Sequence, residues 1–409
     1  MKNSVFFIST KALSLLVVFL CTALIARELG PSDFGLFNEI KIYISIVFIV
    51  SLFGNDAHVI SLMSEGNDKE KIVTIILTRI TLFIMLCIPG YFIFDVEYFV
   101  ALFLMYFFQL LNLSFLRLSV SKKGKVFFAL NMVAFLIVLF FGLLSYNYNY
   151  NYNYNYNYNA YLYFIPLYYF ALFILPFKYI ANSIFLINPS VYFRHLKLIF
   201  LDVWPLILSS FLIFFYTRID FILISHFLSS KELGVYSVAV QLSEPFSFVI
   251  SAYATSIIAD LTLVKNNVLK KSQFISQKLR YIHGFVFFLF IFYLLFGRFL
   301  IELFFGSQYE SSYELLLILI FSKVFVFSNL FFSIVMVVEN NYLARLKRIF
   351  ISMLIAVVIS FILIPNYGLY GAAISVVLSQ FIAVTFINAL SKQTKDYYMI
   401  FVRSFLFWK

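Results

Sequence analysis

Residues 5–26 read VFFISTKALSLLVVFLCTALIA, and Lys11 is the one charged residue in this stretch. A helix crosses the hydrocarbon core of a bilayer with about 20 mostly apolar residues, so the stretch predicts a transmembrane helix. It begins shortly after Lys2 and superficially resembles a signal peptide. Because it is longer than the apolar part of a typical signal peptide, and a second span soon follows, we expect it to be retained.

Eleven further apolar runs of similar length follow along the chain. The twelve predicted spans cover residues 5–26, 41–62, 73–94, 97–116, 127–145, 160–186, 198–228, 234–263, 282–304, 314–338, 348–365 and 370–391. The loops between them are too short for a folded extramembrane domain. The sequence therefore predicts an all-α integral membrane protein of about twelve transmembrane helices, whose activity must reside among the helices.

The composition supports the same class of protein. Of the 409 residues, 63% are hydrophobic and 12% are charged, and the mean hydropathy is +0.97. Soluble globular proteins have about 45–50% apolar and about 25% charged residues. Soluble enzymes, disordered chains and nucleic-acid-binding proteins therefore fit poorly. Cys21 and Cys87 both lie in apolar runs, which makes a disulfide framework or a thiolate metal site improbable.

The positive charges indicate an orientation. There are 30 Lys and Arg residues against 19 Asp and Glu, a net charge of +11. With the N-terminus inside, the cytoplasmic segments hold 21 of the 30, including Arg345 and Arg348. The opposite side holds Arg27, Lys41, Lys231 and Arg298. Because Lys and Arg accumulate in cytoplasmic loops, both termini are expected in the cytoplasm. Binding of anionic lipid head groups is the alternative explanation for the basic loops.

An internal repeat links the two halves of the chain. Residues 24–37, LIARELGPSDFGLF, align without gaps with residues 223–236, LISHFLSSKELGVY, at an offset of 199. Each segment joins the first and second spans of a six-span half, and each has a glycine where the next helix starts, Gly35 and Gly234. Both first spans run outward, so the repeat is parallel, an arrangement that occurs in transporters.

The repeat predicts two six-helix bundles, 1–188 and 198–391, around a central cavity, joined by a linker at 189–197 and followed by a cytoplasmic tail at 392–409. Seven consecutive Tyr-Asn pairs occupy residues 146–159. Strict alternation would put every tyrosine on one side of an extended strand. Because such a strand has no partner, we expect a mobile polar loop at the outer face, tolerated as an insertion.

Three stretches at the start, middle and end of the chain carry a family resemblance. They are ARELGPSDFGLF at 26–37, with Gly54 beyond it; YTRID at 216–220 with LGVYSVA at 233–239; and IPNYGLYGAA at 364–373. In these the chain resembles the polysaccharide and O-antigen flippases, whose superfamily includes multidrug extrusion transporters and the peptidoglycan lipid flippase. The Tyr-Asn repeat departs from the family pattern.

The resemblance implies a function. Undecaprenyl-pyrophosphate-linked oligosaccharide, a unit of O-antigen, capsule or lipooligosaccharide, would move across the bacterial inner membrane by alternating access of two bundles. The implied partners are this lipid-linked oligosaccharide, membrane lipids, a glycan polymerase and other polysaccharide-assembly proteins, and no nucleic acid.

Cations inside the spans are the expected binding groups for a pyrophosphate, because they lower the cost of bringing phosphate into a low dielectric. At 1.5 Å per residue, Lys11, Arg79 and Lys178 lie about 10 Å from the inner ends of their spans. Each is therefore a predicted substrate-binding residue or a cation that snorkels to the interface.

Lys323 and Glu244 lie deeper, about 15 Å along their helices and close to the midplane. We expect Lys323 to bind substrate. Glu244 precedes Pro245, which loosens a helix, so Glu244 suits a gating or ion-coupling point. A structural salt bridge between Glu244 and Lys323 is the alternative.

The seventh span carries two more charges, Arg218 and Asp220, both predicted to contact substrate. They are two residues apart and point to different sides, whereas Tyr216 and Asp220, four apart, share a face. The resemblance favours a cavity position for Asp220, and depth also allows an interfacial one. Asp56, near the inner end of the second span, is a further predicted ion-coupling residue.

Enzyme signatures are absent from the sequence. It contains no Gly-rich phosphate loop followed by Lys-Ser/Thr and no recognisable nucleophile motif. His58 and His283 lack metal-ligand spacing. We therefore expect no catalytic residue, cofactor or metal, and transport driven by an ion gradient, the membrane potential or downstream consumption of substrate.

Two other functions stay open. A drug or cation antiporter of the same superfamily would favour an acidic cavity, whereas the deep residues Lys11, Arg79 and Lys323 against Glu244 lean cationic. A membrane polysaccharide polymerase would need a substantial outer loop with catalytic groups, and the largest loop here is the Tyr-Asn repeat.

Overall fold

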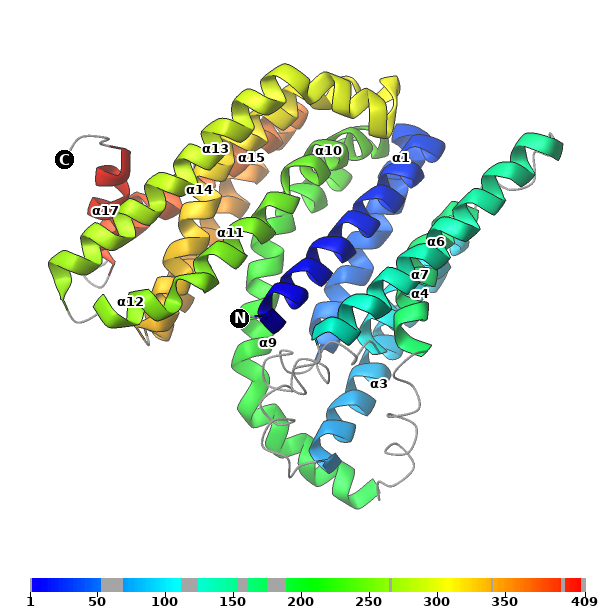
Figure 1. Ribbon diagram of the computed structural model, residues 1–409, viewed down its shortest axis with the longest axis horizontal. Coiled ribbons are helices and arrows are strands. Elements are labelled where there is room, and N and C mark those ends of the chain that lie inside the picture. The colour runs from blue at the N-terminus through cyan, green and yellow to red at the C-terminus, as the bar shows by residue number, and fades with distance from the viewer. Residues whose placement is uncertain are drawn as a thin grey trace. The chain divides into compact units, whose positions relative to one another are not determined.

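The computed structural model describes residues 2–52, 69–111, 124–152, 160–174, 189–264, 267–339, 341–390 and 394–405. These residues form helices and short connections, without a β-strand among them (Figure 1). The elements are α1 (Lys2–Ser51), α3 (Lys69–Ile93), α4 (Val96–Leu111), α6 (Gly124–Tyr152), η1 (Ala160–Tyr163), α7 (Phe164–Ile174), α9 (Pro189–Phe227), α10 (Ser230–Ser243), α11 (Pro245–Ser256), α12 (Ile258–Val264), α13 (Val268–Phe305), η2 (Ser307–Tyr309), α14 (Ser312–Val338), α15 (Tyr342–Val384), α16 (Phe386–Leu390) and α17 (Lys395–Phe405).

Seven stretches of the described chain are long and apolar enough to cross a membrane. Two of them, Ser9–Ser51 and Leu343–Leu390, are each divided by a glycine with a positive φ, 73° at Gly30 and 58° at Gly368. Glycine adopts this backbone region without the steric cost that a Cβ brings, so the chain turns at these two points. Each of the two stretches therefore contains a pair of helices.

Three shorter apolar helices, Val96–Leu111, Phe128–Gly142 and Tyr161–Ile174, complete the set. Two of the seven stretches contain two helices each, so the seven stretches supply nine helices. With the three shorter helices, the described residues contain twelve apolar helices. The predicted all-α membrane protein is thereby confirmed.

Several helices extend beyond the predicted spans. The helix resumes directly after Gly30, so α1 also covers the residues between the predicted spans 5–26 and 41–62. Lys41, counted on the outer side as the first residue of the second span, lies within it. Helix α6 continues to Tyr152 through the first half of the expected loop, and the rest of that repeat lies outside the described residues. Arg345 and Arg348 were both counted as cytoplasmic cations, Arg348 as the first residue of the predicted span 348–365. Both lie within α15, which begins at Tyr342. An apolar run marks where a chain crosses hydrocarbon, whereas a helix continues for as long as its backbone hydrogen bonds are satisfied.

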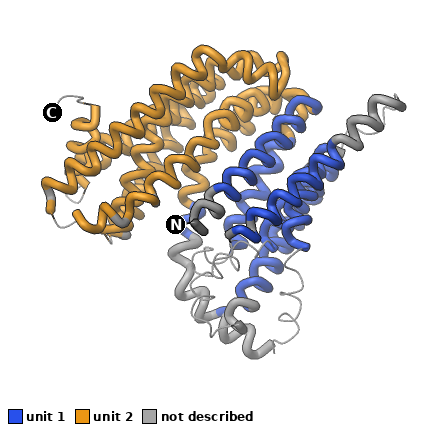
Figure 2. Tube along the Cα trace, viewed as in Figure 1, with its two compact units in different colours: residues 1–28, 37–211 blue, residues 29–36, 212–409 orange. Residues whose placement is uncertain are grey.

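The chain divides into two compact units, shown in separate colours in Figure 2. Unit 1 contains residues 1–28 and 37–211, and unit 2 contains residues 29–36 and 212–409. The division falls inside α9, which also contains the expected linker, residues 189–197. The observed division thus lies after residue 211, whereas the predicted bundles are separated at residues 189–197. Residues 29–36, predicted in the N-terminal bundle, belong to unit 2.

In unit 1, three helices meet at a buried polar cluster. The Tyr168 hydroxyl donates to Asn131 Oδ1 at 2.7 Å, and Ser14 Oγ donates to the same oxygen at 3.1 Å. Ser14 Oγ and the Tyr168 hydroxyl lie 2.8 Å apart. Buried polar groups are stable when they hydrogen-bond one another, so this cluster ties α1, α6 and α7 together.

In unit 2, the two copies of the repeat pack against each other. A Cβ atom added to Gly35 would lie 1.7 Å from the carbonyl oxygen of Ser230, and one added to Gly234 would lie 2.0 Å from the carbonyl oxygen of Pro31. Pro31 and Ser230 are themselves separated by the repeat offset of 199, since 230 − 31 = 234 − 35. The two contacts are thus reciprocal, like those across a two-fold axis. This backbone-to-backbone contact explains why residues 29–36 belong to unit 2.

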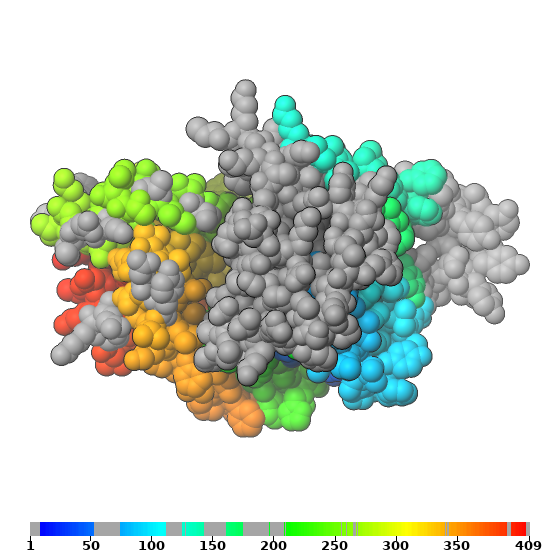
Figure 3. Space-filling model, turned by 90° about the horizontal axis from the view of Figure 1, so that it is seen from below, coloured from blue at the N-terminus to red at the C-terminus, as the bar shows by residue number. Residues whose placement is uncertain are grey.

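The expected cytoplasmic tail contains helix α17, which packs on unit 2. Its residues Tyr397, Ile400 and Phe401 join the hydrophobic core of α13 and α14, and Figure 3 shows the red atoms of this helix against its orange neighbours. Glu339, at the end of α14, accepts hydrogen bonds from Lys271 Nζ at 2.8 Å and from the Tyr397 hydroxyl at 2.5 Å. Burial and the bond to Glu339 raise the pKa of Tyr397, so it remains a donor.

We expect the substitution Glu339→Gln to loosen α17 while leaving the spans intact. It removes the charge that holds both Lys271 and Tyr397, and hydrogen bonds to charged groups contribute about 1.5–3 kcal/mol. Hydrogen exchange of the α17 amides should accelerate about tenfold or more. Glu310→Gln is the control, because its ion pair with Arg298, at 3.9 Å, is largely exposed. Unchanged exchange in α17 would contradict the expected role of Glu339.

Candidate functional site

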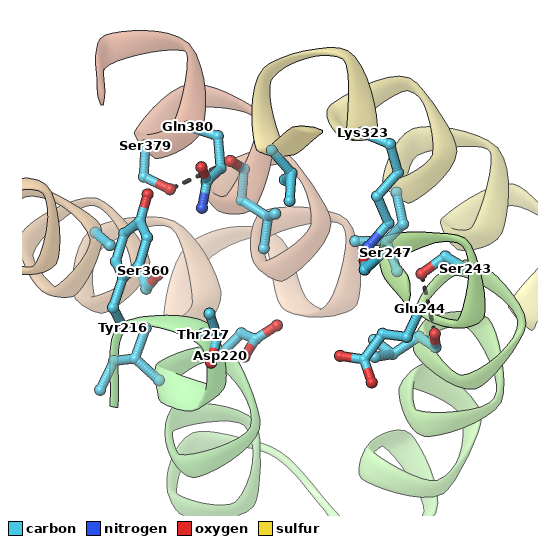
Figure 4. A pocket seen from close by; sticks show the side chains of 16 residues that line it. Tyr216, Thr217, Asp220, Ser243, Glu244, Ser247, Lys323, Ser360, Ser379 and Gln380 are labelled. Carbon is cyan, nitrogen blue, oxygen red and sulfur yellow. Dashed lines mark hydrogen bonds between the residues drawn. The ribbon is translucent and has the colours of Figure 1, made fainter. Parts of the chain in front are cut away.

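A pocket of about 130 Å³ within unit 2 collects several of the charged residues predicted from the sequence (Figure 4). It lies between α9, α10, α11, α14 and α15. Its polar lining consists of Tyr216, Thr217, Asp220, Ser243, Glu244, Ser247, Lys323, Ser360, Ser379 and Gln380. Hydroxyl, carboxylate, amide and ammonium groups therefore face one small volume, an arrangement suited to a polar ligand.

Helix α9 supplies Tyr216 and Asp220, which both line the pocket, as their four-residue spacing predicts. Asp220 is 5% exposed. Its carboxylate accepts hydrogen bonds from the Tyr236 hydroxyl at 2.5 Å and from the backbone N–H of Phe221 at 3.0 Å. Asp220 thus lines the pocket of unit 2.

Glu244 lies at a break between two helices. Helix α10 ends at Ser243 and α11 begins at Pro245, which is tolerated in a first turn because its missing N–H has no intrahelical acceptor there. The Glu244 carboxylate accepts a hydrogen bond from Arg218 Nη2 at 2.9 Å. The side chains of Arg218 and Glu244 are 27% and 42% exposed, so solvent weakens this ion pair.

Lys323 occupies the middle of α14, about 16 Å from its start and about 22 Å from its end at 1.5 Å per residue. It is 8% exposed. Among the described residues its ammonium has no hydrogen-bond or ion-pair partner within 4.0 Å. The expected alternative, a salt bridge between Glu244 and Lys323, is therefore wrong, because Arg218 binds Glu244 instead.

The charges at the pocket balance, since Arg218 and Lys323 are formally matched by Asp220 and Glu244. The predicted cationic excess therefore does not describe this pocket. Glu244 is paired and Asp220 is hydrogen-bonded, which leaves Lys323 as the ammonium available to an anionic ligand. Within the described part of the chain no three His, Cys, Asp or Glu residues are grouped to hold a metal.

The other predicted site residues lie elsewhere. Lys11 on α1 is exposed, and Arg79 on α3 is 2% exposed, both within unit 1. Asp56, His58 and Lys178 fall outside the described residues. His283 packs in unit 2, where its ring stacks on Phe405 with centroids 4.4 Å apart.

Sequence reasoning missed Arg348, which it counted as a loop cation. Arg348 is 5% exposed within α15, and its Nη2 donates to the backbone oxygen of Asn329 at 2.9 Å. A signal was present in the sequence. Arg348 is one of five residues at four-residue intervals, the other four small, which marks a face for close helix packing: Ala344, Arg348, Ser352, Ala356 and Ser360.

A family model described as a polysaccharide biosynthesis protein matches residues 24–314, which include the repeat, α9 and the Glu244 break. The chain belongs to the polysaccharide biosynthesis protein family. Among curated members, the capsular polysaccharide biosynthesis protein CapF of Staphylococcus aureus is 30% identical over 195 residues. That alignment covers 46% of this chain and 48% of CapF, so the chain spans about half the length of this relative.

Solved structures share the fold of this family member. The lipid II flippase MurJ, in an inward closed conformation, has a TM-score of 0.68 at 16% identity, with 99% of this chain and 90% of MurJ covered. A MOP superfamily transporter from Pyrococcus furiosus has a TM-score of 0.59 at 14% identity, with 99% and 95% covered. The family match and this fold confirm the resemblance to polysaccharide flippases stated from the sequence, and with the apolar helices they identify a multi-pass membrane protein.

Proposed function

We propose that the protein is a flippase for undecaprenyl-pyrophosphate-linked oligosaccharide, such as a capsule or O-antigen unit, in the bacterial inner membrane. The observation that carries this proposal is the isolated ammonium of Lys323 in a hydroxyl-lined pocket near the middle of α14. A buried cation is stabilised by an anionic ligand, and the surrounding hydroxyl groups can bind sugar hydroxyls. The polysaccharide biosynthesis family and the capsule-related relative support the same substrate class.

Movement of such a substrate requires alternating access, with both termini in the cytoplasm as the loop cations predict. The junction at Glu244 offers a place for this movement. Glu244 keeps helical φ and ψ, but Pro245 has no N–H with which to continue the hydrogen bonds of α10 into α11. We propose that the partly exposed pair of Arg218 and Glu244 opens and closes during transport, and that Glu244 thereby acts as the gating or ion-coupling residue.

A second candidate function is a cation or drug antiporter. Asp220 and Glu244 put two carboxylates at the pocket, and carboxylates recognise cationic ligands. This function predicts that deletion of the gene sensitises cells to cationic drugs without changing surface glycan, the reverse of the result expected for a flippase.

Deletion of the gene tests the proposed function directly. We expect lipid-linked oligosaccharide to accumulate in the cytoplasmic leaflet, because its synthesis continues while its passage stops. The measurement is the fraction of lipid-linked oligosaccharide that an impermeant glycan-modifying reagent reaches in spheroplasts. Complementation with the intact gene should restore that fraction. An unchanged leaflet distribution in the deletion strain would refute the flippase.

A further inference from the structure

Three residues that line the unit 2 pocket have hydroxyl groups whose protons are already donated to the protein. Each hydroxyl donates to the backbone carbonyl three residues earlier in its own helix, Thr217 Oγ1 at 3.0 Å, Ser243 Oγ at 3.0 Å and Ser379 Oγ at 3.2 Å. A hydroxyl has one proton to donate and two lone pairs with which to accept. These three hydroxyls therefore offer the pocket hydrogen-bond acceptors.

Ser360 provides a fourth acceptor. Its Oγ atom lies 3.0 Å from Ser375 Oγ, and Ser375 Oγ donates to the backbone oxygen of Ala372 at 2.7 Å. Because a carbonyl oxygen cannot donate, the Ser375 proton is committed to Ala372, and Ser360 must supply the proton between the two serines. Ser360, which lines the pocket, therefore has only lone pairs left for a ligand.

Two carboxylates add to these acceptors. Asp220 accepts from the Tyr236 hydroxyl and from the backbone N–H of Phe221, and Glu244 accepts from Arg218. A carboxylate has about four lone-pair positions on its two oxygens. Asp220 and Glu244 can thus accept further hydrogen bonds from a ligand in the pocket that they line.

The lining residues that can donate are fewer. Gln380 is occupied by the protein, because its Oε1 atom accepts from Asn329 Nδ2 at 2.8 Å and its amide group is hydrogen-bonded to Tyr216. Among the described lining residues, the remaining donors are the Lys323 ammonium and the hydroxyls of Tyr216 and Ser247. A site dominated by acceptors favours ligands that bring donors of their own, since other ligands leave buried acceptors unpaired.

The volume of the pocket limits the size of the ligand. The pocket measures about 130 Å³, close to the cavity of about 150 Å³ that holds benzene in an engineered protein. It therefore admits at most one six-membered ring, and any group attached to that ring stays outside.

Three classes of ligand differ in how they meet this pocket. Inorganic phosphate is rich in acceptors, which would face the acceptors of the wall. An organic cation would be repelled by Lys323, and Glu244 is already neutralised by Arg218. A sugar ring carries several hydroxyls, and each of them donates one proton and also accepts. A sugar therefore satisfies the acceptors of the wall and the Lys323 ammonium together.

We infer that the unit 2 pocket binds one sugar ring by its hydroxyl donors, and that Thr217, Ser243, Ser360 and Ser379 select for those donors. Figure 4 shows Ser360 and Ser379 on one side of the pocket and Ser243 on the other, so the acceptors meet the ring from two sides. The assignment rests on the proposed function, and it adds which part of the oligosaccharide this pocket recognises and by which groups.

The test uses the full chain in phosphatidylcholine nanodiscs, with the thermal midpoint measured against concentrations of glucose, galactose and N-acetylglucosamine. We expect at least one of these sugars to stabilise the protein in a saturable way. Its deoxyfluoro analogues, in which fluorine replaces one hydroxyl and cannot donate, should bind about twofold to tenfold more weakly at two or more ring positions. Inorganic phosphate should stabilise the protein less than that sugar does.

Substitution of the acceptors should have a matching effect. Ser243→Ala and Ser360→Ala are each expected to weaken binding of the sugar about twofold to tenfold. Ser237→Ala is the matched control on α10, because Ser237 is also buried and donates to the backbone oxygen of Leu233 at 2.6 Å but does not line the pocket. Exclusion of sugar from a protein surface stabilises all variants alike, so only differences between them count.

Ser243→Ala decides the matter if Ser360→Ala does not fold, because the Ser243 hydroxyl bonds only within its own helix. Three results would each overturn the site: no saturable stabilisation by any of the sugars, equal binding of all deoxyfluoro analogues, or wild-type binding by Ser243→Ala. Tetraphenylphosphonium tests the other class of ligand. Stronger stabilisation by this cation than by the sugars would assign the pocket to cations and also overturn the site.

The deletion experiment keeps this result separate from the proposed function. Failure of the sugar test, with oligosaccharide still accumulating in the deletion strain, would refute the sugar site and leave the flippase intact. Sugar binding that depends on Ser243, with an unchanged leaflet distribution, would refute the flippase and not the site.

Discussion

Replacement of Lys323 with methionine is expected to reduce glycan export about tenfold or more and, at the same time, to stabilise the protein. The ammonium is buried in the middle of α14 without a contact partner in the described residues, so removing it relieves a desolvation cost. A charge-assisted hydrogen bond to phosphate contributes about 1.5–3 kcal/mol, which corresponds to about tenfold to a hundredfold in affinity. Methionine keeps much of the length of the side chain and loses only its charge.

The measurements are surface glycan in a complemented deletion strain and the thermal midpoint of the purified variant. Lys270→Met is the control, because Lys270 is an exposed lysine near the start of α13 and outside the pocket. The two readouts together separate a functional cation from a structural one. A fall in both export and stability would identify Lys323 as a structural residue, and full export would remove it from the site.

The second large effect is expected at the glycine contact between the repeats. Gly35→Ala and Gly234→Ala each place a Cβ atom within about 2 Å of a carbonyl oxygen of the facing segment, which forces the two backbones apart. Overpacking of this kind costs about 1–3 kcal/mol, and the obstacle here is backbone, which cannot rotate away as a side chain can. We expect each variant to lower the thermal midpoint and to reduce export.

A double-mutant cycle sharpens this prediction. Once one alanine has separated the segments, the second meets less resistance, so the effect of Gly35→Ala with Gly234→Ala should be smaller than the sum of the single effects. Gly284→Ala is the control, since nothing lies within 4 Å of its added Cβ, and alanine is favoured over glycine in a helix. Additive effects of the two substitutions would show that the glycines do not share one contact.

The fold was predictable because the deciding signals are local. Apolar runs indicated twelve spans, but they did not show how far the helices extend beyond them. Helix α1 continues from Pro31 into the second span, and α6 continues to Tyr152, into the segment predicted to be a loop. Even the glycine contact could be anticipated in part, because residues 24–37 and 223–236 match without reference to a structure. That they touch reciprocally could not be predicted, since alignment says nothing about distance.

The candidate site was only partly predictable. Periodicity along α9 correctly put Tyr216 and Asp220 on one face, because both residues belong to the same helix. The alternative pairing of Glu244 with Lys323 rested on their similar depth in the membrane. The structure pairs Glu244 with Arg218 instead, a choice that depends on how α9 and α10 are rotated toward each other. Arg348 was counted as a topological cation because charge alone does not distinguish a loop from a buried helix face.

By itself, then, the sequence determined that this is an all-α membrane protein with a duplicated motif, because hydrophobicity and repetition are properties of consecutive residues. The tertiary structure alone decided which charges meet. Arg218 neutralises Glu244, Lys323 is left without a contact partner in the described residues, and Arg348 is buried beside the pocket. The physical reason is that a charge in a low-dielectric interior is governed by neighbours a few ångströms away, and packing brings those neighbours from helices that are distant in the chain.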